Sequence, residues 1–212
     1  MSTYQSPADT RSPATLTRLG LACVVSGVLG ILLAILSVAY PPAVPEEQWS
    51  YPFPAGVLLV VSVLLAVTHA LTLVGFLGVR LADPYRGRRV AIVGLWLAIV
   101  GLGVLTVCEL AGGAIGSAPM TSPTAVTVSA AFGVGSLLNA LGCILAGVVI
   151  VRAGVWRGVG RWMVLASGLV LVLLVTPANI SGNPVFRMVA LALWSATFIP
   201  LGRTISRSVP AL

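Results

Sequence analysis

The chain has 212 residues, of which 58% are hydrophobic and only 8% are charged, and its formal net charge is +7. A soluble domain carries about 25% charged residues, so a chain this poor in charge cannot cover a water-facing surface and must use lipid as its solvent. The basic residues are all arginine and lie in short segments between apolar runs. That distribution is typical of a topology signal in a membrane protein, and it argues against nucleic acid as the binding partner of these arginines.

Six apolar runs follow one another along the chain, and at a rise of 1.5 Å per residue most of them are long enough to cross a bilayer. We expect an all-α integral membrane bundle of six transmembrane helices in one domain, residues 18–203, flanked by a disordered tail (1–17) and a short C-terminal tail (204–212). The expected helices are 19–40, 55–79, 90–112, 125–151, 162–180 and 188–201.

The first apolar run has a basic front and a Ser37-Val38-Ala39 triplet, features that it shares with a cleaved signal peptide. The apolar part of a signal peptide is usually about 7 to 15 residues long, and this run is longer. We therefore favour a retained helix, with a cleaved signal peptide as the alternative.

The arginines are distributed very unevenly between the two sides of the predicted bundle. Cytoplasmic loops are enriched in basic residues, so the arginine-rich side is expected inside, with both termini cytoplasmic. Only Arg187 falls on the outer side. The inner set is Arg11, Arg18, Arg80, Arg86, Arg88, Arg89, Arg152, Arg157, Arg161, Arg203 and Arg207.

The segment 41–54 is an irregular outer loop, with five prolines, two glutamates and no arginine. Its aromatic residues Trp49, Tyr51 and Phe53 suit an interfacial belt that anchors the chain at the membrane surface. A ligand-binding role for the same residues is the alternative.

Three of the predicted helices carry stripes of small and polar residues at three- and four-residue steps, the spacing of one helix face. In a bilayer, helices associate through such residues, so we expect the three faces to meet at the bundle axis. The stripes are Ser62, Ala66, His69 and Thr72; Gly94, Ala98, Gly101 and Glu109; and Ser129, Gly133, Ser136, Ala140, Cys143 and Gly147.

A first candidate site is intramembrane and consists of His69, Asn139 and Ser136. His69 and Asn139 each lie 14 residues inside a helix that starts on the outer side, about 21 Å down. At equal depth the imidazole and the carboxamide can form a hydrogen bond. Polar groups within spans are a default functional hypothesis, so a proton relay or ligand site stands beside a purely structural pair.

A second candidate site lies at the outer mouth and consists of Glu109, Arg187 and Asn179. Glu109 is 19 residues out from Val90, about 28 Å up the third helix. Arg187 begins the sixth helix at a similar level. We expect the two charges to form an ion pair or to share a water-filled vestibule with Asn179 and Ser181.

No catalytic, metal or nucleotide motif is present in the sequence. The cysteines Cys23, Cys108 and Cys143 are odd in number, lie in apolar runs and are not spaced as metal ligands. We predict no cofactor and no enzymatic activity.

The stretch Leu138–Gly147, followed by Arg152-Ala153-Gly154-Val155-Trp156-Arg157 and the fifth apolar run, resembles uncharacterised multi-pass membrane proteins of actinobacteria. In those proteins a small-residue helix ends in an Arg-Ser/Ala-Gly-Val turn, followed by an aromatic and a basic residue. The resemblance implies a bacterial plasma-membrane protein with several spans, and it carries over no functional residues.

Three functions remain open on these grounds. The first is a non-enzymatic accessory or scaffold protein that assembles with itself or with a membrane-protein partner. The second is a small-solute or proton-coupled transporter with a polar path between the second, third and fourth helices, and the third is an intramembrane enzyme. The expected contacts are the lipid bilayer and, at the inner arginines, anionic lipid head groups.

Overall fold

The computed structural model describes residues 13–208 of the chain. Within this part, six helical segments are long and apolar enough to cross a membrane, and no strand is present. The prediction of an all-α bundle with six membrane spans is therefore confirmed. The first four spans are single helices, namely α1 (Pro13–Ala39), α2 (Ala55–Ala82), α3 (Arg89–Ala114) and α4 (Pro123–Ala153).

The fifth and sixth spans are each divided. The fifth consists of α5 (Gly160–Val170), a π-helical turn η1 (Leu171–Val175) and α6 (Thr176–Ser181). The sixth consists of α7 (Pro184–Ala196) and α8 (Phe198–Ser206).

Several helix ends differ from the predicted ones. Residues 13–17, expected in the tail, form the first turn of α1, where proline is favoured because it has no N–H to leave unpaired. The rest of the expected tail, 1–12, lies outside the described residues. The sixth span is longer than expected at both ends: it begins at Pro184 after a cap in which Phe186 N donates to Asn183 Oδ1 at 3.0 Å, and it includes residues 204–206 of the expected C-terminal tail.

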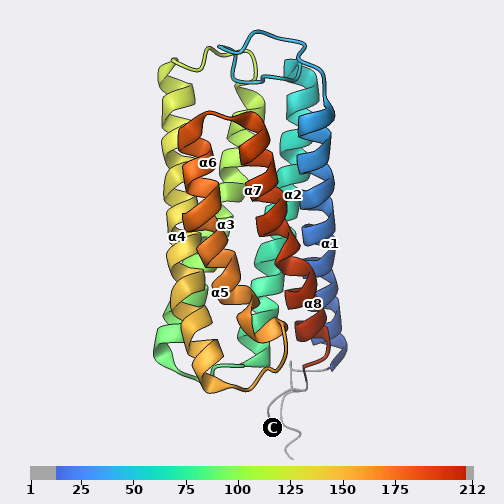
Figure 1. Ribbon diagram of the computed structural model, residues 1–212, viewed down its shortest axis with the longest axis vertical. Helices are drawn as coiled ribbons and strands as arrows, with labels where there is room; N and C mark the ends of the chain where they lie inside the picture. Colours follow the sequence, from blue (N-terminus) through green and yellow to red (C-terminus); the bar gives the residue numbers. More distant parts are fainter. Residues whose placement is uncertain (1–12, 209–212) are drawn as a thin grey trace, which may run out of the picture.

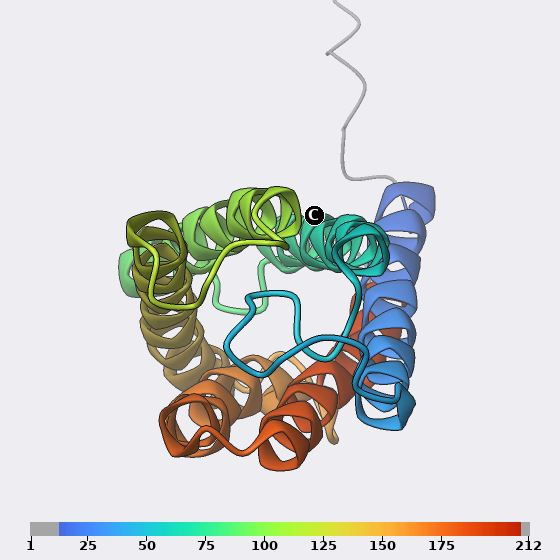
Figure 2. The same cartoon turned by 90° about the horizontal axis from the view of Figure 1, so that it is seen from above.

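The helices form a ring, seen from above in Figure 2. Each span lies next to the one that follows it in the chain, and α1 closes the ring against α7 and α8. We call the end of the ring that holds the turns 83–88 and 154–159 the arginine end; the loops 40–54 and 115–122 lie at the opposite end (Figure 1).

At the arginine end, the turn between α2 and α3 is built around a buried tyrosine. The Tyr85 hydroxyl accepts a hydrogen bond from Arg80 Nη1 at 2.9 Å, and burial raises the pKa of Tyr85. Gly87 N donates to Asp83 Oδ1 at 2.8 Å, which fixes the turn. These contacts fix the shape of the turn that leads from α2 into α3.

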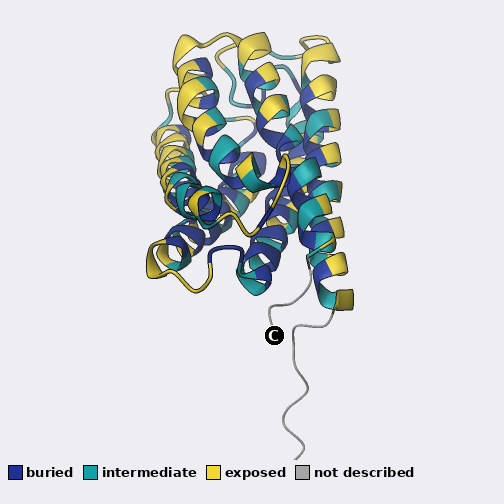
Figure 3. Ribbon diagram, turned by 60° about the horizontal axis from the view of Figure 1, so that its bottom comes forward, coloured by how far each residue is buried: buried dark blue, intermediate teal, exposed yellow. Residues whose placement is uncertain are grey.

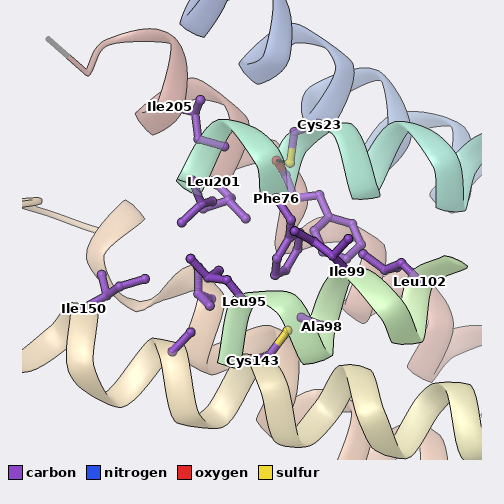
Figure 4. Packing of buried hydrophobic residues seen from close by; sticks show 14 of the residues in the cluster. Cys23, Phe76, Leu95, Ala98, Ile99, Leu102, Cys143, Ile150, Leu201 and Ile205 are labelled. Carbon is purple, nitrogen blue, oxygen red and sulfur yellow. Dashed lines mark hydrogen bonds between the residues drawn. The ribbon is translucent and has the colours of Figure 1, made fainter. Parts of the chain in front are cut away.

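The hydrophobic core lies mainly in the arginine half of the ring, and Val175, Ala178 and Ala190 extend it along the fifth and sixth spans toward the opposite end. Its members from α2, α3 and α4 come from the half of each helix that is nearer the arginine end, and α8 completes it. Phe76, Leu95, Leu102 and Leu201 are fully buried members of this core, and Figure 4 shows them in the cluster, with Phe76 between Leu201 and Leu102. Their burial closes the interior of this half to a solute.

Neighbouring helices approach each other through small residues. A methyl group added at Gly94 would lie 2.7 Å from Ala146 N, and one added at Gly147 would lie 2.7 Å from Leu165 Cβ. In this way α4 uses one small-residue face against α3 and another against α5. Figure 3 shows the complementary pattern, since the outward faces of the helices are exposed and apolar, as lipid contact requires.

The expectation that three small-residue faces meet at the bundle axis is therefore wrong for α3 and α4. Each helix of a ring has two neighbours, so its small residues are divided between two contacts. The face of α4 that meets α3 consists of Gly135, Asn139, Gly142 and Ala146. Of the predicted α4 stripe, Cys143 lies against Gly168 of α5, whereas Ser129 and Gly133 are exposed.

Candidate functional site

A cavity of about 320 Å³ lies inside the ring at the end opposite to the arginine end. Its wall is formed by the last turn of α1, the loop 40–54, and parts of α2, α3, α4 and α7. Most of the wall is apolar, with Val61 and Leu65 from α2 and Met188 from α7. The packed core closes it toward the arginine end.

The loop 40–54 forms the roof of this cavity, and in Figure 2 it crosses the middle of the ring. It is held to the loop after α3 by backbone hydrogen bonds: Trp49 N donates to Ala118 O at 2.9 Å, and Met120 N donates to Glu47 O at 2.8 Å. These hydrogen bonds to the neighbouring loop give the roof a defined shape.

The aromatic residues of the loop line the cavity. Phe53 is 4% exposed, its ring centroid lies 4.7 Å from that of Tyr40, and Trp49 and Tyr51 complete this part of the wall. We expected Trp49, Tyr51 and Phe53 as an interfacial belt, and for Phe53 burial excludes that role. The turns of the proline-rich loop direct these side chains inward.

Two charged residues lie in the cavity wall, Glu109 from α3 and Arg187 from α7. Of the two arrangements expected for them, the ion pair is absent, and the two residues share a cavity that does not include Asn179 and Ser181. Among the described residues the one ion-pair contact joins Glu109 Oε1 to His69 Nδ1 at 3.9 Å. Glu109 therefore approaches a histidine below the cavity while it also faces the cavity itself.

Asn179 and Ser181 are not part of this cavity. Asn179 Nδ2 donates to Val175 O at 2.9 Å, and Ser181 Oγ donates to Ala178 O at 2.8 Å. Both side chains are thus satisfied within the end of the fifth span. The predicted outer-mouth group is reduced to Glu109 and Arg187.

The intramembrane trio His69, Asn139 and Ser136 does not come together as one site. Asn139 Nδ2 donates to Ala98 O at 3.1 Å, so the carboxamide joins α4 to α3. No hydrogen bond links it to His69, and Ser136 is half-buried on α4 without a side-chain hydrogen bond among the described residues. His69 instead contacts Glu109 and, at 5.8 Å between ring centroids, Trp194.

The sequence predicted different depths for His69 and Glu109. That prediction treated the helices as starting at equal levels and took no account of the direction in which the side chains point. Gly116, beyond the end of α3, lies against Ala55, the first residue of α2, so α3 ends below the start of α2. In a helix the Cα–Cβ bond tilts toward the N-terminus. Because α2 and α3 are antiparallel, the two side chains lean toward each other.

Two nitrogen atoms at this site lack partners. His69 Nδ1 and Arg187 Nε are both buried without a hydrogen bond. Burial of a polar group without a partner is costly, and more so for a charged group inside a membrane. The site thus combines a guanidinium whose Nε has no hydrogen bond, a carboxylate and an aromatic surface. In the described part, no three His, Cys, Asp or Glu residues form a group that could hold a metal ion.

Three contributors to this site were not anticipated from the sequence. Phe132 of α4 and Met188 of α7 line the cavity, and Trp194 of α7 packs against the His69 ring. Each is an ordinary apolar residue of a membrane span, so no sequence signal distinguishes it. For Trp49, Tyr51 and Phe53, by contrast, the sequence had left a ligand-binding role open as the alternative to an interfacial belt.

The fold and the site define a polytopic α-helical membrane protein in contact with the lipid bilayer, with a solute-sized cavity at one end. A comparison of the chain with protein-family profiles, curated proteins and solved structures finds no significant match. The geometry of the cavity is therefore the basis for inferring a function.

Proposed function

We propose that this protein is a non-enzymatic accessory component of a membrane assembly that holds a small amphipathic molecule in the cavity beneath the loop 40–54. The observation that carries the proposal is the half-open cavity of about 320 Å³, with an arginine in its wall whose buried Nε has no hydrogen bond. Known ligand pockets begin at about 300 Å³ and combine an apolar wall with a few polar groups, as this one does.

The setting of the proposal is a bacterial plasma membrane, as in the actinobacterial proteins that the chain resembles. The arginine distribution supports cytoplasmic termini, arginine loops in contact with anionic lipid head groups, and a cavity that faces outward. The packed core in the arginine half favours holding a molecule over conducting it, because no polar path continues through Phe76, Leu95 and Leu201.

Native mass spectrometry of the gently extracted protein tests this function. We expect the wild type to retain a non-lipid small molecule, and any stoichiometric protein partner will appear in the same spectrum. The variant Gly112→Leu should lose the small molecule, because its side chain would start 3.4 Å from Trp49 Nε1 and extend into the cavity.

Gly103→Leu is the matched control for this experiment, since it changes the same helix at a position with no neighbour within 4 Å of the added carbon. It should retain the bound molecule. Retention by both variants, or by neither variant nor the wild type, contradicts the proposal.

A second candidate, a proton-coupled carrier, is favoured by two observations. The His69–Glu109 contact lies next to the cavity on its inner side. The fifth span contains the π-helical turn η1, and such turns often occur at functional sites. A carrier has to change shape, and a span in which a π-helical turn interrupts the α-helical hydrogen bonds can bend at that turn.

His69→Leu separates the two candidates. An accessory protein should tolerate it with unchanged retention of the small molecule, since an apolar side chain of similar size fills the place next to Trp194. A carrier that moves a proton through the imidazole should lose uptake of that molecule into proteoliposomes under an imposed pH gradient. Uptake at the wild-type rate by His69→Leu would exclude the imidazole from transport.

A further inference from the structure

We propose that the cavity selects a zwitterionic amphipath, a molecule with an acid group that binds Arg187, an amine that binds Glu109 and an apolar body that lies on the aromatic roof. This inference rests on the proposed function, in which the cavity holds a small molecule. It adds the chemical class of that molecule.

Arg187 provides the site for the acid group. It is the one arginine that the charge pattern assigns to the outer side, so the positive-inside rule gives no reason for its presence. Its Nε is buried without a hydrogen bond, and no carboxylate of the described residues lies within ion-pair distance of it. A guanidinium binds a carboxylate or phosphate through two parallel hydrogen bonds, which would satisfy it.

The first turn of α7 strengthens this preference. Pro184, Val185 and Arg187 of that turn all line the cavity. The N-terminal end of a helix carries a partial positive charge, which favours an anion near it.

Glu109 provides the site for the amine. Its side chain is 13% exposed, and its contact with His69 Nδ1, at 3.9 Å, is longer than a hydrogen bond. A ligand with an acid group alone would place a second negative charge in the same cavity as this carboxylate. An amine on the ligand removes that repulsion and satisfies the carboxylate, so the two wall charges together favour a molecule that carries both signs.

The size and the surface of the cavity further define the class of molecule that it can hold. A volume of about 320 Å³ accommodates a molecule of the size of an amino acid with a large apolar side chain. Trp49, Tyr51 and Phe132 offer aromatic faces for its body. The ethanolamine phosphate head group of a lipid has the same combination of acid and amine, so the test has to separate a free solute from a lipid.

The experiment uses the full chain in phosphatidylglycerol nanodiscs, labelled with fluorotryptophan and observed by fluorine NMR. The Trp49 signal is assigned with Trp49→Phe. Three probes share one apolar body: phenylalanine, phenylpropionate (acid alone) and phenethylamine (amine alone). We expect phenylalanine to shift the Trp49 signal with an affinity at least ~10-fold above that of either analogue, because one charge-assisted hydrogen bond is worth about a factor of ten.

Two variants test which charged residue of the wall binds which group of the ligand. Arg187→Gln should weaken phenylalanine and phenylpropionate about 10-fold and leave phenethylamine unchanged. Glu109→Gln should weaken phenylalanine and phenethylamine and leave phenylpropionate unchanged or tighter. Arg203→Gln, an exposed position near the arginine end, is the control and should change nothing. The probe that each variant still binds shows that the variant is folded.

Equal affinity for the three probes, or tightest binding of phenylpropionate, would overturn the inference. A Trp49 signal that moves on addition of phosphatidylethanolamine but not of phenylalanine, and no longer does so in Arg187→Gln, would support it with a lipid as the source. If no probe and no lipid shifts the signal, the inference fails. The proposed function still stands in that case if native mass spectrometry shows a small molecule that Gly112→Leu loses.

Discussion

At the scale of single residues, the buried polar side chains of this protein occupy two kinds of environment. Ser26 of α1 and Thr72 of α2 are hydrogen-bonded to each other, and Trp194 Nε1 of α7 donates to Ser167 Oγ of α5 at 2.9 Å. These pairs join neighbouring helices and are satisfied. Three buried side-chain nitrogen atoms of the described residues have no hydrogen bond: those of His69 and Arg187 lie at or beside the cavity, and Arg80 Nε lies at the arginine end.

Asn139 provides a test of the first kind of environment. It is 1% exposed, and its amide donates to Ala98 O of α3. We expect Asn139→Leu to reduce the free energy of unfolding by about 0.6 to 2 kcal/mol, the range measured for interhelical hydrogen bonds in membranes. Unfolding in mixed micelles, followed by helicity, measures this change.

The same substitution should leave retention of the cavity-bound molecule unchanged, because Asn139 is not part of the cavity wall. If a folded Asn139→Leu protein lost that molecule, Asn139 would have to be counted as part of the functional site.

At the scale of the helices, close contact between α3 and α4 depends on glycine. Gly94 lies against the backbone of α4, whereas Gly103, on the same helix, has no neighbour within 4 Å of an added carbon. Where backbones touch, even one methyl group must push the helices apart. The two glycines therefore form a matched pair that separates packing from helix propensity.

We expect Gly94→Ala to destabilise the protein by about 1 to 3 kcal/mol, as overpacking does. Gly103→Ala should be neutral or stabilising by up to ~1 kcal/mol, because alanine is the better helix former. The measurement is the free energy of unfolding of both variants under the same conditions. Equal effects of the two substitutions would show that α3 and α4 do not pack closely at Gly94.

The fifth and sixth spans show how proline changes a span without ending it. Pro177 has no N–H, and its ring clashes with the carbonyl of the residue four positions earlier. The helix widens just before it into η1, and Thr176 Oγ1 donates to Leu171 O at 2.9 Å. In the sixth span the break between α7 and α8 falls at Thr197, three residues before Pro200, the position at which proline disturbs the helix.

At the scale of the whole molecule, the ring has two unlike halves. The arginine half is filled by the hydrophobic core, and the opposite half holds the cavity and its roof. No contact joins α6 to α3 or α4, whereas α5 packs along α4. The fifth span thus diverges from α4 toward the opposite end of the ring.

The orientation of this molecule in the membrane can be measured with single cysteines. In a background with Cys23, Cys108 and Cys143 replaced by alanine, Met120→Cys should react with an impermeant maleimide in intact cells. Val155→Cys should react only after the cells are permeabilised. Both positions are exposed, at 47% and 41%. The expectation follows from the arginine excess at the end that holds Val155, and the reverse labelling pattern would invert the topology.

The number of spans and their helical structure were determined by the sequence alone, because the length of an apolar run and the cost of an unpaired backbone group in lipid are local properties. Glu109 and Arg187 were also recognisable as unusual, since charge is rare inside spans and arginine is rare on the outer side. Turn chemistry such as the Asn183 cap shifted the helix ends by a few residues.

Only the tertiary structure decided which of these residues meet. Glu109 contacts His69 because of the relative levels of α2 and α3 and the opposite tilt of their side chains. Asn139 lies in a helix contact because of the rotation of α4 in the ring. The loop 40–54 covers the cavity because it is bonded to the next loop. The relative levels of the helices, their rotation about their own axes and the docking of the loop depend on contacts between distant parts of the chain. No local sequence pattern encodes these contacts.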